Sequence, residues 1–125
     1  MIITDVLTQN ARLYGDEVSL VEVNPEIREK IDKAWEEYDL VESIPKPSHR
    51  HEITWNEFEG KANKLSHYLL GEGITKGTKV ALLLMNCIDW LPIYFGILKT
   101  GAVVAPMNFR FSADEIKYCL ELSES

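Results

Sequence analysis

Hydrophobic and polar residues along this chain follow two spacings, one typical of helices and one typical of strands. Apolar residues three and four positions apart predict helices between Thr4 and Gly15, and at 26–38, 56–71, 89–99 and 112–122. Short apolar runs predict strands at 18–23, 80–85 and 102–105. Because helices and strands alternate without any internal repeat, the pattern predicts one α/β domain, with parallel strands in a layered fold.

Local signals mark where several of these helices begin. Thr54 and Glu57 are spaced as a capping box, and Ser112 with Glu115 repeats that spacing before the last helix. The stretch 39–52 is rich in proline and polar residues, so it is expected to be a loop.

The run at 80–85 contains no polar residue, which is typical of a strand covered on both faces. The helix at 89–99 is apolar around most of its circumference and is expected to be deeply packed. Gly101 is placed to end that helix, and Pro106 is placed to end the strand at 102–105.

Composition narrows the class of protein. The chain has 125 residues, and its 13 basic against 20 acidic residues leave a formal charge of −7, which argues against nucleic acid or an anionic membrane as the main partner. No apolar run is long enough to span a membrane, and the first residues lack the basic region of a secretory signal. Cys87 and Cys119 are isolated, so we expect half-buried reduced thiols in a cytoplasmic protein.

Few residues are arranged for chemistry. The glycines within 71–78 follow a helix and precede a strand, whereas phosphate-binding loops leave a strand and enter a helix. His49, His51 and Glu52 lack a further strong metal ligand nearby, so they are expected to lie in a solvated loop. From the residues alone we assign no catalytic, cofactor-binding or metal-binding residue.

Two motifs resemble those of a known enzyme family. Ile53–Phe58 is similar to the first core motif of the AMP-forming acyl-CoA synthetases, within the larger group of adenylate-forming enzymes. Gly96–Asn108 is similar to the second core motif. The residues that carry the two motifs, and that the resemblance makes structural, are Thr54, Glu57, Lys99, Gly101, Pro106 and Asn108.

The resemblance implies an architecture. It makes residues 1–125 a single subdomain, with a partial parallel sheet, in the large N-terminal domain of such an enzyme. Residues 24–51 are longer than the connection in many members, so the predicted helix at 26–38 is expected to be an insertion.

The resemblance also implies a reaction. An intact synthetase would convert a fatty or aryl carboxylate, ATP and CoA into acyl-CoA, AMP and pyrophosphate, with Mg²⁺ as a further cofactor. The motifs that bind these groups in the family have no counterpart in residues 1–125, so the chain is expected to be an inactive N-terminal fragment. Its expected partners are the remainder of its own polypeptide and, in isolation, further copies of itself. The alternative is a free-standing, non-catalytic α/β binding or adaptor domain.

Overall fold

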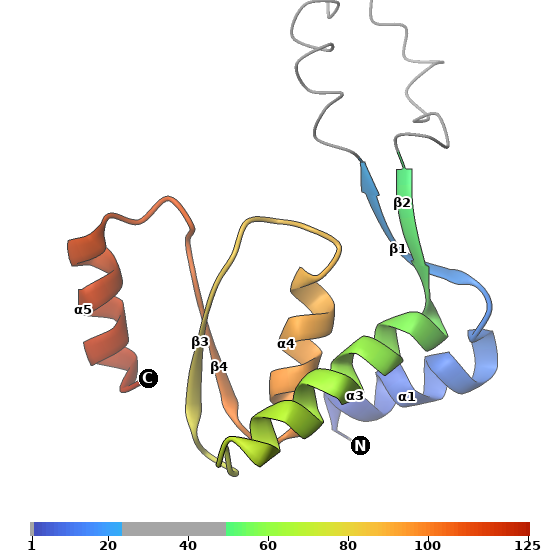
Figure 1. Cartoon of the computed structure of the whole chain (residues 1–125), viewed down its shortest axis with the longest axis horizontal. Coiled ribbons are helices and arrows are strands. Elements are labelled where there is room, and N and C mark those ends of the chain that lie inside the picture. The colour runs from blue at the N-terminus through green and yellow to red at the C-terminus, as the bar shows by residue number, and fades with distance from the viewer. Residues whose placement is uncertain (1, 24–49) are drawn as a thin grey trace, which may run out of the picture.

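Helices and strands alternate along the part of the chain that the computed structural model describes, residues 2–23 and 50–125. The order is α1 (Ile3–Tyr14), β1 (Val18–Val23), β2 (Arg50–Thr54), α3 (Trp55–Gly71), β3 (Lys79–Leu83), α4 (Trp90–Lys99), β4 (Val103–Met107) and α5 (Ala113–Ser123). Figure 1 shows an elongated arrangement, with α1 and the β1–β2 pair at one end and α5 at the other. The helix expected at 26–38 and the loop expected at 39–49 lie outside the described residues.

The parallel pairing expected from the sequence is confirmed in β3 and β4, which run side by side from Lys79 and Val103 to Leu83 and Met107. Helix α4 connects the two strands. The other pair, β1 and β2, is antiparallel, with Val23 opposite Arg50. The described α/β arrangement therefore combines a parallel pair of strands with an antiparallel pair.

The hydrophobic core lies where α1, α3, the β1–β2 pair and the segment that leads into α4 meet. Its buried members are Leu7, Ile53, Phe58, Ala62 and Ile88. The Phe58 ring lies between two other aromatic rings, with its centroid 6.0 Å from that of Trp55 and 5.5 Å from that of Phe95. These rings join the start of α3 to the middle of α4, so the core fixes the two helices against each other.

Several expected boundaries are wrong. The strand expected at 80–85 spans Lys79–Leu83. Three further differences have a local explanation. The helix expected to begin after Thr4 begins at Ile3, where the carboxylate of Asp5 accepts a hydrogen bond from the Ile2 backbone N–H at 3.1 Å. Thr4 is therefore a buried residue inside α1 and does not precede it. Residues 50–52 belong to β2 because they pair with β1. Pro106 lies inside β4, opposite Leu82, which a proline can do on an outer strand whose N–H groups are not all required.

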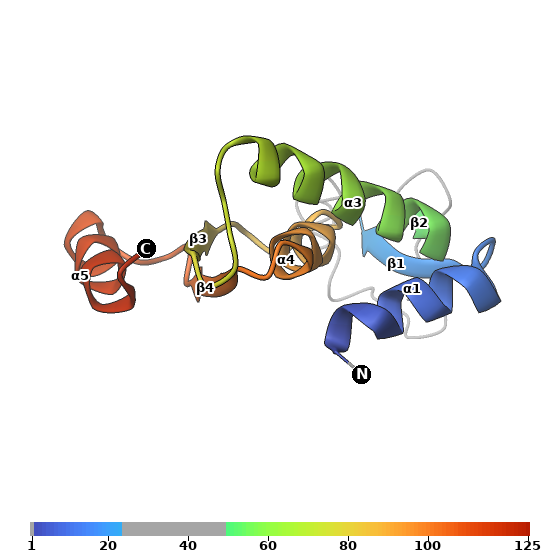
Figure 2. The ribbon, with the colours of Figure 1, turned by 90° about the horizontal axis from the view of Figure 1, so that it is seen from below.

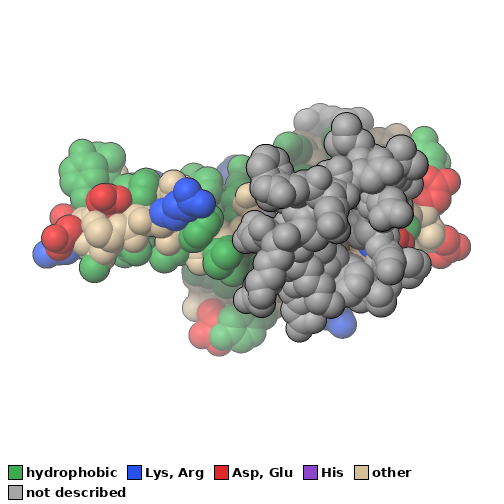
Figure 3. Space-filling model, turned by 90° about the horizontal axis from the view of Figure 1, so that it is seen from above, with side chains coloured by type: hydrophobic (Ala, Val, Ile, Leu, Met, Phe, Trp, Pro, Cys, Tyr) green, Lys and Arg blue, Asp and Glu red, His purple; other side chains and the backbone are tan. Residues whose placement is uncertain are grey.

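The coverage expected on both faces of the strand at 80–85 is not found. Leu82 is 6% exposed, whereas Leu83 is 44%, Met85 is 56% and Val103 is 50% exposed. Figures 1 and 2 place α4 and α5 on opposite sides of the β3–β4 pair, but α5 buries none of its own side chains. Figure 3 shows hydrophobic side chains exposed along this end of the molecule. The described part of the chain therefore covers its parallel strands incompletely.

Candidate functional site

The first motif builds the beginning of α3. The Thr54 hydroxyl accepts a hydrogen bond from the Glu57 backbone N–H at 3.1 Å, and the Glu57 carboxylate accepts one from the Thr54 N–H at 3.3 Å. The predicted capping box is thus confirmed. At the second predicted box, Ser112 accepts from the Glu115 N–H at 3.3 Å, and this is the single capping bond found at the start of α5.

The second motif contributes a lysine that joins α4 to α3. The Lys99 ammonium donates to the side-chain oxygen of Asn63 at 2.7 Å and lies 3.4 Å from a carboxylate oxygen of Glu59. The Lys99 side chain is 14% exposed and that of Glu59 is 21% exposed. The charge is therefore held in a polar cluster that water reaches poorly, and it ties the end of α4 to the middle of α3.

Gly101 positions the start of β4. Its φ of +84° lies in the left-handed region that favours glycine, and a Cβ there would lie 3.3 Å from the Cα of Lys76. Its carbonyl accepts the Gly77 N–H at 3.0 Å, so the turns that enter β3 and β4 are fastened to each other. The glycines of 71–78 thus serve a turn between α3 and β3, as the sequence predicts, with Gly73 and Gly77 at positive φ.

Polar residues follow both β3 and β4 along the chain. Because the strands are parallel and in register at Leu83 and Met107, Asn86 and Asn108 both follow the carboxyl edge of the pair. The Asn108 side-chain oxygen accepts the Arg110 N–H at 3.0 Å, and the exposed Arg110 guanidinium lies 5.4 Å from the centroid of the Phe109 ring.

Ligands of open α/β sheets bind outside the carboxyl ends of the strands. Two amides and a guanidinium can hydrogen bond to phosphate or carboxylate oxygens, so this edge is the candidate binding site. The sequence analysis assigns no role to Arg110, which lies two residues beyond the second motif. Its position directly after a parallel strand is the signal that points to binding.

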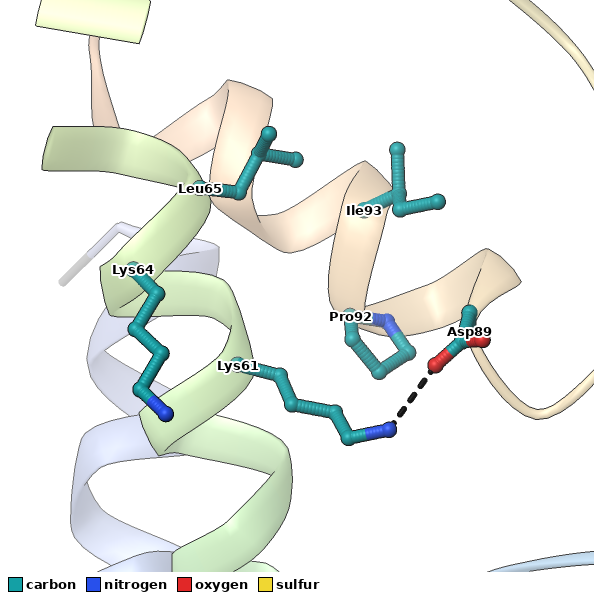
Figure 4. A pocket seen from close by; sticks show the side chains of 6 residues that line it. All are labelled: Lys61, Lys64, Leu65, Asp89, Pro92 and Ile93. Atoms are coloured by element: carbon teal, nitrogen blue, oxygen red, sulfur yellow. Dashed lines mark hydrogen bonds and ion pairs between the residues drawn. The ribbon is translucent and has the colours of Figure 1, made fainter. Parts of the chain in front are cut away.

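A shallow hollow lies between α3 and α4, on the side where α4 begins (Figure 4). It has a volume of about 330 Å³, and its lining residues are Lys61, Lys64, Leu65, Asp89, Pro92 and Ile93. The Lys61 ammonium lies 2.9 Å from a carboxylate oxygen of Asp89, and this ion pair crosses from one helix to the other.

The other candidate residues are dispersed. Cys87 and Cys119 are free and half-buried, as expected. His51 lies on β2 with its Nδ1 atom 3.9 Å from a carboxylate oxygen of Glu22, while His49 lies outside the described residues. Residues 2–23 and 50–125 contain no group of three or more His, Cys, Asp or Glu side chains that could hold a metal ion.

Comparison with known proteins decides the family. A sequence profile described as AMP-binding enzyme matches residues 29–125. The chain belongs to the AMP-binding enzyme family. This confirms the resemblance carried by the two motifs, and the match covers both of them.

Curated relatives of this AMP-binding enzyme chain are CoA ligases. A medium/long-chain-fatty-acid–CoA/3-oxocholest-4-en-26-oate–CoA ligase of Mycobacterium marinum is 38% identical over 73 residues, which are 58% of this chain and 13% of that protein. The long-chain-fatty-acid–CoA ligase FadD13 of Mycobacterium tuberculosis is 33% identical over 85 residues, which are 68% of this chain and 17% of that protein. The chain therefore matches less than a fifth of the length of either relative.

Solved structures of the family share the fold. A Mycobacterium tuberculosis fatty acyl CoA synthetase superposes with a TM-score of 0.72 at 26% identity, over 98% of this chain and 20% of that one. The anthranilate CoA ligase AuaEII superposes with a TM-score of 0.71 at 22% identity, over 98% of this chain and 19% of that one. The expected fold class, an α/β part of the N-terminal domain of an adenylate-forming enzyme, is confirmed. Among the described helices, none is long and apolar enough to cross a membrane.

Proposed function

We propose that this chain is the N-terminal scaffold of an acid–CoA ligase of the AMP-forming type. The intact enzyme would join a fatty or aryl carboxylate to CoA, with cleavage of ATP to AMP and pyrophosphate. The observation that carries the proposal is the AMP-binding enzyme profile over residues 29–125, and the CoA ligases among the relatives support it.

In that enzyme, the chain's own role would be to fix the positions of the residues at the carboxyl edge of β3 and β4. The Lys99 cluster fixes α4 to α3, and Gly101 fixes the turns that enter the two strands. Arg110 at this edge suits contact with a phosphate group of ATP or CoA. No described residues are grouped to bind Mg²⁺, so we expect the metal and the reacting atoms to be held by the remainder of the polypeptide, and the chain alone to be inactive.

The incompletely covered face of the β3–β4 pair supports the same proposal. Parallel strands are usually covered by other elements on both faces, yet Leu83 and Val103 remain about half exposed here. We propose that the remainder of the same polypeptide packs on this face. The two half-buried free cysteines suit a reducing compartment, and we therefore place the enzyme in the cytoplasm.

Carboxylate-dependent exchange of pyrophosphate into ATP tests this function. The native gene product, isolated with an antibody against this segment, should catalyse the exchange when a fatty or aryl acid is added, and the 125-residue chain should not. Replacing Arg110 by Gln in the native-length protein should raise the KM for ATP or for CoA, whereas Arg12→Gln on α1 should leave both unchanged. Exchange by the isolated chain, or none by the native product with any such acid, would overturn the proposal.

A further inference from the structure

A carboxylate on β1 is hydrogen bonded to the loop between β3 and α4, which passes beside the β1–β2 pair (Figure 1). One oxygen of Glu22 accepts the Ile88 backbone N–H at 3.2 Å, although the two residues are 66 positions apart in the sequence. The other oxygen lies 3.9 Å from Nδ1 of His51, the residue opposite Glu22 on β2. Because the Glu22 side chain is 29% exposed, β1 directs a poorly hydrated charge at a single backbone group.

The core holds the Ile88 side chain, but the hydrogen bond to Glu22 orients its peptide group. The Ile88 side chain is 5% exposed and belongs to the core. Apolar packing has no preferred direction, whereas a hydrogen bond does. The peptide group between Cys87 and Ile88 is held on both sides, because Glu22 accepts its N–H and its carbonyl accepts the Trp90 N–H at 3.1 Å. The direction of the chain just before Ile88 is therefore fixed.

The peptide group that Glu22 holds lies next to the candidate binding edge along the chain. Strand β3 ends at Leu83, and Asn86 directly precedes the held peptide group with an exposed side chain. At the other end of the loop, a carboxylate oxygen of Asp89 lies 2.9 Å from the Lys61 ammonium on α3. The loop that carries Asn86 is thus fastened to β1 and to α3 on the side where α4 begins.

We propose that Glu22 is a positioning residue for this edge, because it fixes the Cys87–Ile88 peptide group and thereby the place where Asn86 offers its amide to a substrate. The inference rests on the proposed ligase function, in which Asn86 faces an anionic group of ATP or CoA. A carboxylate repels such a group, so Glu22 acts through the loop and does not bind the substrate. The role requires an acceptor oxygen at this place and not a negative charge.

Amide signals of the isotope-labelled chain in NMR spectra test the hydrogen bond. Glu22→Ala should move the Ile88 amide proton upfield and speed its exchange with solvent, because its acceptor is lost. Glu22→Gln, which keeps an acceptor oxygen, and His51→Gln, which leaves Glu22 in place, should retain the parent signal. The signals of α3 report whether each variant folds. An Ile88 signal that stays in place in Glu22→Ala, or that moves in Glu22→Gln, would overturn the inference.

Kinetics of the native-length protein test the positioning role. Glu22→Ala should raise the KM for ATP or for CoA about fivefold, comparable to the loss of one hydrogen bond, with kcat little changed. Asn86→Ala should raise the same KM about fivefold, and the double variant should be no worse than either, because Glu22 acts through Asn86. Glu22→Gln should restore the parent KM. Glu17→Ala, at an exposed carboxylate just before β1, is the matched control and should change nothing.

Two kinetic outcomes would overturn the positioning role. One is a parent KM in Glu22→Ala, and the other is a rise of about 25-fold in the double variant, which independent sites would produce. Absence of ligase activity in the parent protein is a different result. It would overturn the proposed function and with it the role of Asn86, whereas the Ile88 signal would still decide whether Glu22 fixes the loop.

Discussion

Lys99 places an ammonium where only 14% of its side chain is exposed, so its polar partners on α3 decide whether that position is stable. Replacing it by Ala removes the donor to Asn63 and leaves the carboxylate of Glu59 without its positive neighbour. We expect a loss of about 1–3 kcal/mol in the free energy of unfolding, measured by urea denaturation. Lys117→Ala on exposed α5 is the control and should stay within about 0.5 kcal/mol. Equal small losses in both variants would contradict a structural role for Lys99.

The protonation of Glu124 reports on the ion pair that joins the end of α5 to the start of β3. Hydrogen bonding and charge attraction from Lys79, whose ammonium is 2.7 Å away, lower the pKa of the Glu124 carboxyl. A carboxyl with a lowered folded-state pKa stabilises the fold above its unfolded pKa and loses that contribution as the pH falls through the folded value.

Lys79→Gln should therefore raise the pKa of Glu124 to its ordinary value. The chemical shift of the Glu124 side-chain carboxyl carbon in an NMR titration measures this pKa. The same substitution should flatten the acid end of the stability curve. Lys76→Gln, on the preceding turn, is the matched control and should leave Glu124 unchanged. A pKa of Glu124 that is the same with and without Lys79 would contradict the pairing.

The residues at the helix starts show which local features the sequence can predict. The bonds between Thr54 and Glu57 are made within four residues, so spacing alone predicts them. Thr4 is different, because Asp5 supplies the acceptor one turn into α1 and thereby moves the helix start to Ile3. Where two acceptors compete for one helix end, tertiary burial decides, and Thr4 is 8% exposed.

The contact between α3 and α4 depends on a glycine at the crossing. Gly96→Ala would place a methyl group 3.0 Å from the carbonyl oxygen of Ala62, a member of the buried core, and 3.0 Å from the side chain of Leu65. The two helices must separate, at an expected cost of about 1–3 kcal/mol in the free energy of unfolding.

Gly60, in the middle of α3, is the matched control. A Cβ there meets nothing within 4 Å, so Gly60→Ala should stabilise the chain by about 0.5–1 kcal/mol through helix propensity. Opposite signs in the two variants, measured by urea denaturation, support tight α3–α4 packing. A neutral or stabilising Gly96→Ala would show that the helices are farther apart than described.

The sequence predicts the described helices, whereas it predicts the strand pairing only in part. The apolar spacing in α3 and α4 is local and survives any arrangement of neighbours. Strand β2 contains the polar sequence Arg50-His51-Glu52, and only its pairing with β1 makes it a strand. That pairing joins residues about 30 positions apart, which no local pattern contains.

The whole molecule exposes apolar surface that a complete domain would cover. Leu83, Met85 and Val103 are 44%, 56% and 50% exposed beside a two-stranded parallel sheet with open edges. We expect the isolated chain to associate with itself as its concentration rises, with a mass above the 14.3 kDa of the monomer in sedimentation experiments.

Leu83→Lys should weaken that association, because it places a charge on the uncovered face. Leu13→Lys, at a similarly exposed leucine of α1, should have little effect. A chain that stays monomeric at high concentration would show that this apolar face does not drive association.

The candidate site also belongs to the whole molecule. Asn86, Asn108 and Arg110 are polar residues in two loops, and nothing in their spacing relates the loops to each other. They come to one edge only because β3 and β4 are parallel and in register. The sequence predicts the parallel strands, but the edge becomes a site only when the residues that follow both strands are considered together.

The native size of the gene product tests the central claim, that this chain is the scaffold of a longer ligase, most directly. An immunoblot of the source cell with an antibody against residues 50–125 compares that product with the 14.3 kDa chain. The account predicts a band several times larger, in keeping with relatives of which this chain matches 13% and 17%. A single band at 14.3 kDa would contradict it and favour a free-standing binding or adaptor domain.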